Sequence, residues 1–423
     1  MSLPSRIKKT DAPYIACIAA IILAGILFRI LFVINVPTEQ LYDFAAYKEI
    51  AVNIKNGLGH SLGGVPVAWQ GPLYPYALGA FYRLFGTESD LAGKILNIIL
   101  SSLTLILSVP VYGRLIKSRG RTIAAVALTA FLPANIAYVN VLGTEVIFAF
   151  ILFVIIFLQL FYSDRYLSYP VIGAMTGLAA LTKPFMLAFP AVLILLYWLK
   201  YKKARATLIF AGVIISCACA VIAPWVFRNY RLFGRFIPVS YNGGYVQFIN
   251  NNDKNHNGLW MDHLEPGTLN LEPGINVKTS PELEPLFAEE AGRWITSNLG
   301  EFLKLGFLRV NETFFDNAYD IPQWAMNRAE LGAERNANAI SAALALVNKL
   351  LAAAGLVFVI SRFPAFFKGL RPGNAVSEGD MTAFLTILFF AAVIFVSEGQ
   401  ARYAFPVFPF FVYAIMRIKV PVS

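Results

Sequence analysis

Long apolar runs, separated by short polar segments, recur along most of the chain. A helix needs about 20 mostly apolar residues to cross the hydrocarbon core of a bilayer. Lipid offers no hydrogen-bond partners to a lone strand or coil, so each crossing must be helical. The pattern predicts about ten membrane-spanning helices, although several runs are short or closely spaced enough to merge or to form a re-entrant segment. Their ranges are 13–34, 91–113, 122–142, 144–162, 167–182, 184–200, 206–227, 338–360, 381–397 and 402–418.

Composition agrees with this pattern. The chain has 423 residues, of which 57% are hydrophobic and 14% are charged, whereas a soluble domain carries about 25% charged residues. The sequence therefore predicts an all-α polytopic membrane protein. Its three cysteines all lie inside predicted spans, which argues against a disulfide framework outside the membrane. They are Cys17, Cys217 and Cys219.

The basic residues of the short loops fall on one side of the membrane if the chain crosses ten times. By the positive-inside rule that side is cytoplasmic, which predicts cytoplasmic termini. We expect an integral protein of a bacterial inner (plasma) membrane. These residues account for most of the net charge of +10, so the charge gives no reason to expect a nucleic-acid partner. They are Arg6, Lys8, Lys9, Arg114, Lys117, Arg119, Arg121, Arg165, Lys200, Lys202, Lys203, Arg205, Arg362, Lys368, Arg371, Arg417 and Lys419.

Two longer segments remain on the opposite, periplasmic or extracellular face. The chain then divides into an N-terminal membrane module over residues 1–227, a periplasmic loop domain over 228–337 and C-terminal membrane helices over 338–423. The first module contains an outer loop, 35–90, which we expect to carry the chemistry.

The first outer loop carries two amphipathic segments. Apolar residues fall on one helical stripe over 43–57, which predicts a helix lying on the membrane surface. The segment 72–85 is also apolar, but it contains Pro72, Pro75 and Arg83 and is short for a full crossing. We therefore expect an interfacial helix there.

Asp43 is the first candidate for chemistry. It would lie at the N-terminus of the first interfacial helix, one turn from Tyr47, where the helix dipole favours an ionised carboxylate. Such a group suits a general base. Asp is also a favoured N-cap residue, although Ala46 stands where a capping box would have Glu or Gln. The spacing supports cap and catalyst about equally, and one residue can be both.

Three further charged residues lie at predicted span ends on the same outer face. Glu145 opens the fourth span, where an ionisable group is often functional but can equally be a hydrated helix end. Lys183 opens the sixth span, either as a contact for a lipid phosphate or as a snorkelling lysine. Arg228 follows the seventh, and its planar guanidinium suits phosphate, with headgroup anchoring as the alternative.

Arg402 and Tyr403 open the tenth span, where Arg402 can simply pair with Glu398. The chain has neither a P-loop nor a dinucleotide-binding glycine motif, and no Asp-x-Asp pair of the kind that holds a metal-bound nucleotide sugar, so nucleotide chemistry is disfavoured. The histidines have no partner at metal-ligand spacing, and we interpret them as ordinary polar surface. They are His60, His256 and His263.

A series of short motifs follows in order from about residue 40 to 410. The series comprises Asp43 and Tyr47 with Asn56-Gly57-Leu58-Gly59, then Gly71-Pro72-Leu73-Tyr74-Pro75, Leu84-Phe85-Gly86, Glu145, Gly177-Leu178-Ala179-Ala180-Leu181-Thr182-Lys183-Pro184, Pro224-Trp225-Val226-Phe227-Arg228-Asn229-Tyr230, and Arg402-Tyr403 with Pro406 and Pro409. This ordered set resembles the GT-C superfamily of polytopic glycosyltransferases, in its protein mannosyltransferase-like and aminoarabinose transferase-like branch. Phe44 departs from the Asp-Glu pair of many protein O-mannosyltransferases, which leaves the acceptor open.

The resemblance implies a GT-C-like bundle and an inverting transfer of a sugar from a polyprenyl-phosphate donor to an acceptor hydroxyl. It implies no obligatory cofactor, although some relatives use a divalent metal, and the acceptor can be protein, lipid or glycan. Asp43 would be the catalytic base. The implied substrate-binding residues are Lys183, Arg228 and Arg402 for the phosphate and Tyr47, Gln70, Tyr74, Glu145 and Tyr403 around it.

Two other functions fit a polytopic protein that meets lipid-linked sugars. A transporter or flippase should carry polar residues deep in its spans, whereas the candidates here cluster at span ends on one face. A polysaccharide polymerase or ligase would use a similar donor but needs a long acceptor groove. The sequence favours a transferase and does not identify the sugar.

Overall fold

A computed structural model gives the fold of residues 12–261, 276–316, 319–329, 334–371 and 374–417. The basic residues predicted at the N-terminus, Lys419 and His263 lie outside these described residues.

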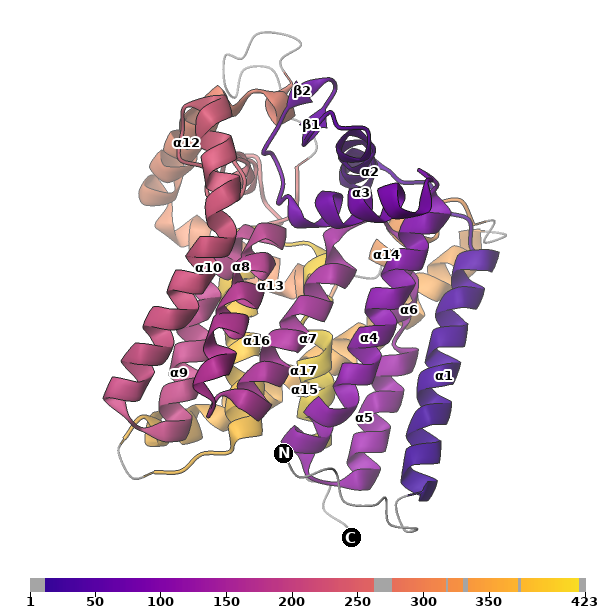
Figure 1. Cartoon of the computed structure of the whole chain (residues 1–423), viewed down its shortest axis with the longest axis vertical. Helices are drawn as coiled ribbons and strands as arrows, with labels where there is room; N and C mark the ends of the chain where they lie inside the picture. The colour runs from indigo at the N-terminus through magenta and orange to yellow at the C-terminus, as the bar shows by residue number, and fades with distance from the viewer. Residues whose placement is uncertain (1–11, 262–275, 317–318, 330–333, 372–373, 418–423) are drawn as a thin grey trace.

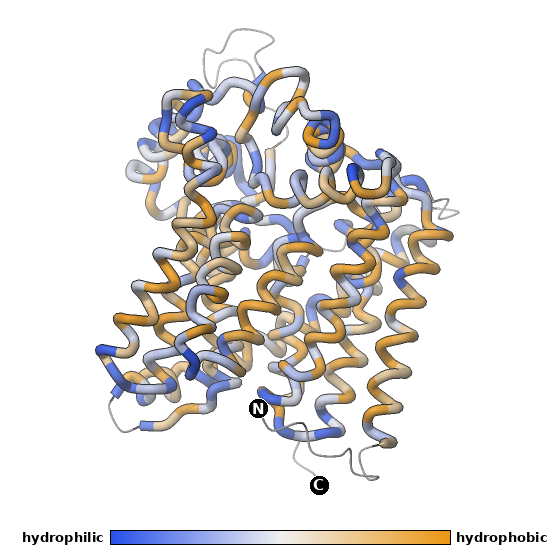
Figure 2. Tube along the Cα trace, viewed as in Figure 1, coloured by the Kyte–Doolittle hydropathy of each residue, from blue (hydrophilic) through white to orange (hydrophobic). Residues whose placement is uncertain are grey.

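The described chain is almost entirely helical, and its long helices run side by side (Figure 1). Apolar residues cover most of their length, and polar residues gather at the two ends of the bundle (Figure 2). The bundle consists of α1 (Ala12–Asn35), α4 (Asp90–Ile116), α5 (Arg119–Phe131), α6 (Pro133–Ala137), α7 (Thr144–Tyr162), α8 (Tyr169–Thr182), α9 (Phe189–Tyr201), α10 (Ala204–Phe233), α15 (Glu334–Leu370), α16 (Glu378–Val396) and α17 (Phe408–Arg417).

Length and apolar composition identify fewer spans than the ten predicted. Seven helices among the described residues are long and apolar enough to cross a membrane, or eight if the pair Arg119–Phe131 and Pro133–Asn140, bent by 52°, is one span. The predicted spans 167–182 and 402–418 form α8 and α17, which have 14 and 10 residues. Both short helices still run between the two ends of the bundle: Lys183 directly after α8 pairs with Glu145, and Arg402 before α17 pairs with Asp43 whereas Arg417 at the end of α17 pairs with Asp380. The chain is an integral membrane protein with seven or eight candidate spans among its described residues.

The predicted grouping of the basic loops is confirmed by ion pairs at one end of the bundle. Glu378 lies 3.3 Å from Arg114 and 2.7 Å from Lys200, and so joins two loops that the sequence placed on the same side. Asp380, two residues further on, pairs with Arg362 and Arg417. Which side of the membrane this end faces remains a prediction.

The opposite end of the bundle is covered by short elements. They are α2 (Tyr42–Lys55), β1 (Ser61–Leu62), β2 (Val65–Pro66), α3 (Leu73–Phe85), α11 (Gly243–Asn250), α12 (Glu284–Ser297), α13 (Leu299–Phe314), α14 (Asp320–Ala325) and the 3-10 helices η2 (Tyr138–Asn140), η4 (Pro184–Ala188), η5 (Val277–Thr279), η6 (Pro281–Leu283) and η7 (Ala401–Ala404). The 3-10 helix η3 (Tyr166–Ser168) instead joins α7 to α8 at the end of the bundle that carries the basic loops. The two strands form an antiparallel hairpin. Its turn residues, Gly63 and Gly64, have φ of 57° and 79°, as tight hairpin turns require.

The two interfacial segments expected in the first loop are both helices. Helix α3 lies across the ends of the long helices (Figure 1) and ends at Gly86, whose φ of 63° is a common helix terminator. It packs closely on α2, because a Cβ at Gly79 would lie 2.8 Å from the carbonyl oxygen of Ala51. This close packing places the first turn of α2 over the bundle.

Candidate active site

Asp43 lies in the first turn of α2, but it does not cap the helix. The N-cap position is Leu41, and no side chain accepts a hydrogen bond there. The Asp43 carboxylate instead accepts a hydrogen bond of 3.1 Å from Nη2 of Arg402 and lies 3.5 Å from Nζ of Lys278. The N-cap interpretation is therefore wrong, and the carboxylate faces two cations that come from distant parts of the chain.

Arg402 lies on η7, and the residues that precede it in the chain are tightly packed. The backbone N–H of Gly399 donates to the carbonyl of Gly258 at 3.2 Å, and a Cβ on Gly399 would lie 2.9 Å from the Cα of Arg309. Arg309 is fully buried and donates to the carbonyl of Phe395 at 3.0 Å. These contacts hold the chain that leads into Arg402.

The expected pairing of Glu398 with Arg402 is not what the structure shows. Arg402 donates from Nε to Oε1 of Gln400 at 2.6 Å and forms ion pairs with Asp43 and, at 4.0 Å, with Glu145. Glu398 accepts hydrogen bonds from the Tyr403 hydroxyl and, at 3.3 Å, from the Gln400 amide. Arg402 is therefore directed toward Asp43.

Glu145 and Lys183 form the buried half of the same cluster. Glu145 is 3% exposed, and its Oε1 lies 3.3 Å from the Lys183 ammonium. The Lys183 ammonium also lies over the Tyr403 ring, 5.0 Å from its centre. Glycine suits position 143, directly before this helix, since a Cβ there would contact Oε2 of Glu145 and would lie 2.8 Å from the Phe44 ring. Glu145 is thus a buried ion-pair partner and not a hydrated helix end, and Lys183 is not a snorkelling lysine.

Burial and charge act in opposite directions on these groups. Burial favours the neutral form of the Asp43 carboxyl, but the charges of Arg402 and Lys278 outweigh it and lower the pKa of Asp43. Burial lowers the pKa of Lys183, although Glu145 opposes the shift. Burial raises the pKa of Glu398. The two cations therefore hold the Asp43 carboxylate in its ionised form.

Two residues of this site were missed by sequence reasoning. Lys278 lies on η5, where its carbonyl accepts a hydrogen bond of 2.8 Å from the Tyr241 hydroxyl. Asp320 lies at the start of α14, is 6% exposed and has a pKa raised by burial to about 7, partly opposed by Arg402. Neither residue belongs to a motif or a membrane span, so no local signal in the sequence distinguishes them.

Aromatic and polar side chains surround the charges. The rings of Tyr47 and Tyr74 meet edge to face at 5.8 Å, and the Tyr74 hydroxyl donates to Asn97 at 3.4 Å. Gln70 is buried, and the next residue, Gly71, passes so close to the end of α8 that a Cβ there would lie 2.6 Å from the carbonyl oxygen of Leu181. The chain around Gln70 therefore lies beside the segment that carries Lys183.

Arg228 has a different environment from the other predicted phosphate contacts. It lies inside α10, which continues past the expected end of the span at residue 227 to Phe233. Its guanidinium donates to the carbonyls of Val67 at 2.8 Å and His60 at 2.7 Å. His60 is also not surface: it is 2% exposed, and burial lowers its pKa to about 3. Arg228 thus ties the first loop to α10.

The resemblance allows a divalent metal, but within the described ranges no three His, Cys, Asp or Glu side chains are grouped to hold one.

Comparison with known proteins adds evidence on the fold. No protein-family profile and no curated protein sequence matches the chain. Among solved structures, it is similar to the archaeal oligosaccharyltransferase AglB from Archaeoglobus fulgidus in complex with an inhibitory peptide and a dolichol-phosphate, with a TM-score of 0.55 and 13% identity over 96% of this chain and 50% of AglB. A second structure of the Archaeoglobus fulgidus oligosaccharyltransferase, tethered to an acceptor peptide containing the NVT sequon, matches with a TM-score of 0.54 and 13% identity over 96% of this chain and 49% of that one.

This chain spans about half the length of AglB, and at 13% identity the likeness concerns the fold alone. The GT-C resemblance of the motifs stays a prediction.

Proposed function

We propose that this protein is an inverting glycosyltransferase that moves a sugar from a polyprenyl-phosphate donor to an acceptor hydroxyl. The observation that carries the proposal is the Asp43 carboxylate, held between Arg402 and Lys278 at the end of a membrane bundle. Such a site can bind a phosphate and accept a proton at the same place. The complex of AglB with a dolichol-phosphate supports a lipid-linked donor for this fold.

In the proposed reaction, a carboxylate oxygen of Asp43 takes the proton of the acceptor hydroxyl. The acceptor oxygen then forms a bond to the anomeric carbon as the bond from that carbon to the phosphate oxygen breaks. The electron pair of that bond leaves with the polyprenyl phosphate, and attack from the opposite face inverts the configuration. Arg402, Lys183 and Lys278 stabilise the negative charge that grows on the leaving phosphate.

The ion pairs of Asp43 suggest how the base becomes active. With Arg402 and Lys278 bound to it, Asp43 is a weak base, because the two cations stabilise its ionised form. A donor phosphate would compete for the same cations. Their transfer to the phosphate would raise the pKa of Asp43 and strengthen the base when a donor is present.

The groups around the charges would shape the sugar pocket. We assign this role to Tyr47, Gln70, Tyr74 and Tyr403, with Glu145 orienting Lys183 from behind. Arg228 is not assigned to the phosphate, because its guanidinium is bonded to two backbone carbonyls of the first loop.

The proposal can be tested with purified protein in detergent and a synthetic polyprenyl-phosphate-linked sugar. A transferase releases polyprenyl phosphate when a suitable acceptor is present, which mass spectrometry detects. A flippase leaves the donor intact in this assay, because a micelle does not separate two aqueous compartments. Screening of sugars and of protein, lipid and glycan acceptors can be guided by the glycans and lipids that change in a deletion strain. Failure to consume any donor in detergent, together with movement of the donor across liposome membranes, would overturn the proposal in favour of a flippase.

A further inference from the structure

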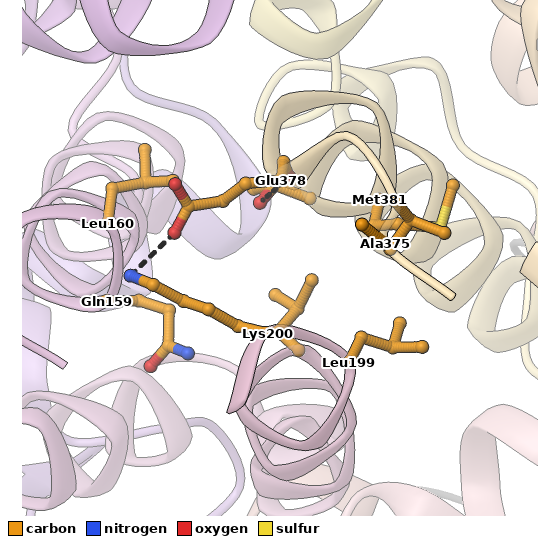
Figure 3. Close-up of a pocket in the computed structure, with 10 residues that line it drawn as sticks. Gln159, Leu160, Leu199, Lys200, Ala375, Glu378 and Met381 are labelled. Carbon is orange, nitrogen blue, oxygen red and sulfur yellow. Dashed lines mark hydrogen bonds and ion pairs between the residues drawn. The ribbon is translucent and has the colours of Figure 1, made fainter. Parts of the chain in front are cut away.

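A cavity lies far from Asp43, at the end of the bundle where the basic loops meet. It has a volume of about 140 Å³ and lies between α7, α9, the segment before α16, and α16 itself (Figure 3). Gln159 on α7 lines it, whereas Glu145 of the active site opens the same helix. At about 1.5 Å of rise per residue, roughly 21 Å of helix separates the two. The cavity is therefore a site distinct from the proposed catalytic centre.

Gln159 is a buried polar residue whose side-chain oxygen lacks a hydrogen-bond donor. The residue is 3% exposed, and its Oε1 has no hydrogen-bond partner within the part of the chain that the structure describes. A buried amide oxygen without a donor destabilises the folded state. Figure 3 shows its side chain among the residues that line the cavity, close to Lys200. A ligand that supplies a polar group here would remove that destabilisation.

Lys200 supplies a positive charge at the same cavity. Its ammonium lies 2.7 Å from Glu378 and donates to Ser163 at 3.1 Å, so two of its three N–H groups have acceptors (Figure 3). Glu378 also pairs with Arg114 at 3.3 Å, so one carboxylate faces two cations. The local excess of positive charge favours an anion.

The remaining wall of the cavity is apolar. Leu160, Leu196, Leu199, Val376 and Met381 contribute to it. The volume is well above the roughly 15 Å³ that a single water molecule needs. A site with a cation, an open amide and an apolar wall between membrane helices suits the headgroup and glycerol region of a phospholipid, whose acyl chains continue into the bilayer.

We propose that this cavity binds an anionic phospholipid with a hydroxylated headgroup. The phosphate lies against Lys200, and a headgroup hydroxyl donates a hydrogen bond to Oε1 of Gln159. The leucine side chains cover the glycerol region. Binding would join α7, α9 and α16, three helices whose opposite ends lead to Glu145, Lys183 and Glu398.

The test uses the full chain, purified and delipidated in detergent, with phosphatidylglycerol as the probe. Phosphatidylcholine and glycerol 3-phosphate serve as the comparison ligands, and binding is followed by native mass spectrometry and by the lipid-induced shift in melting temperature. We expect one phosphatidylglycerol per chain and a stabilising shift that phosphatidylcholine and glycerol 3-phosphate do not give. Gln159→Leu and Lys200→Gln should each weaken binding about tenfold, as expected for the loss of a hydrogen bond to a charged ligand.

Arg205→Gln is the matched control, because it removes one exposed positive charge next to the same loops but outside the cavity. It should bind phosphatidylglycerol as the unsubstituted protein does. Gln159→Leu is itself expected to raise the melting temperature without lipid, since it removes an unpartnered amide, so the comparison rests on the lipid-induced shift. Equal binding of phosphatidylglycerol by all three variants would overturn the proposal. Binding of glycerol 3-phosphate alone would overturn the lipid as ligand and point to a soluble phosphate compound.

Discussion

Asp43→Asn is the substitution that separates the proposed base from the residues that bind the donor. The amide keeps the size and a hydrogen-bond acceptor of the carboxylate but cannot take a proton at neutral pH. Loss of a positioned general base lowers a rate by about 10²–10⁴-fold, or roughly 3–5 kcal/mol in the activation free energy. We therefore expect the turnover rate for sugar transfer to fall by this factor.

Donor binding should respond in the opposite way. In the unsubstituted protein, Arg402 at 3.1 Å and Lys278 at 3.5 Å are occupied by the Asp43 carboxylate. Asparagine releases both cations to the donor phosphate, so the affinity for the donor should be unchanged or higher. The fold should survive, because the Asp43 side chain is 28% exposed and ion pairs of partly exposed groups contribute only about 1 kcal/mol.

The assay measures single-turnover rates and donor dissociation constants in detergent, with polyprenyl phosphate release as the signal. Glu49→Gln is the matched control, because it removes an exposed carboxylate from the same helix. A normal turnover rate in Asp43→Asn would refute the assignment of the base. A loss confined to donor affinity would show that Asp43 acts only by organising the cations.

Three further predictions concern the ion pairs and the buried carboxyl. Lys183→Met should destabilise the protein by roughly 3–5 kcal/mol, because it leaves buried Glu145 without its partner. Adding Glu145→Gln should restore most of the stability but not donor binding. Unfolding and binding measurements on this double-mutant cycle test both parts, and recovery of donor binding would remove Lys183 from the phosphate site. The pKa of Asp320 is raised from 3.8 to about 7, so between these pH values the folded state binds a proton that the unfolded state has released. The stability of the folded state should therefore fall as pH rises through this range. Asp320→Asn should reduce this dependence of melting temperature on pH, and an unchanged dependence would contradict the prediction. Arg228→Gln should lower the melting temperature, because it leaves two loop carbonyls without their donor. The affinity for the donor should stay within about threefold of that of the unsubstituted protein, a difference of less than 1 kcal/mol. A large loss of donor affinity in folded protein would return Arg228 to the phosphate site.

Local sequence determined the parts of this fold that follow from helical periodicity and from the requirements of a membrane. The predicted segments 43–57 and 72–85 correspond to α2, Tyr42–Lys55, and α3, Leu73–Phe85. Apolar length and basic loops likewise identified a polytopic protein, because a backbone in lipid must satisfy its hydrogen bonds within each helix. Length and composition alone identify seven or eight spans among the described residues, because α8 and α17 are shorter than a full crossing.

Tertiary structure decided which candidate residues share a site. Asp43 and Arg402 are 359 positions apart, and no local pattern states that their side chains lie 3.1 Å from each other. The same folding brought Lys278 and Asp320 to this cluster and directed Arg228 to the carbonyls of the first loop. A residue's type and its place on a helix end follow from the sequence. The partner of a charge depends on distances between segments remote in the chain, which only the packing of the helices sets.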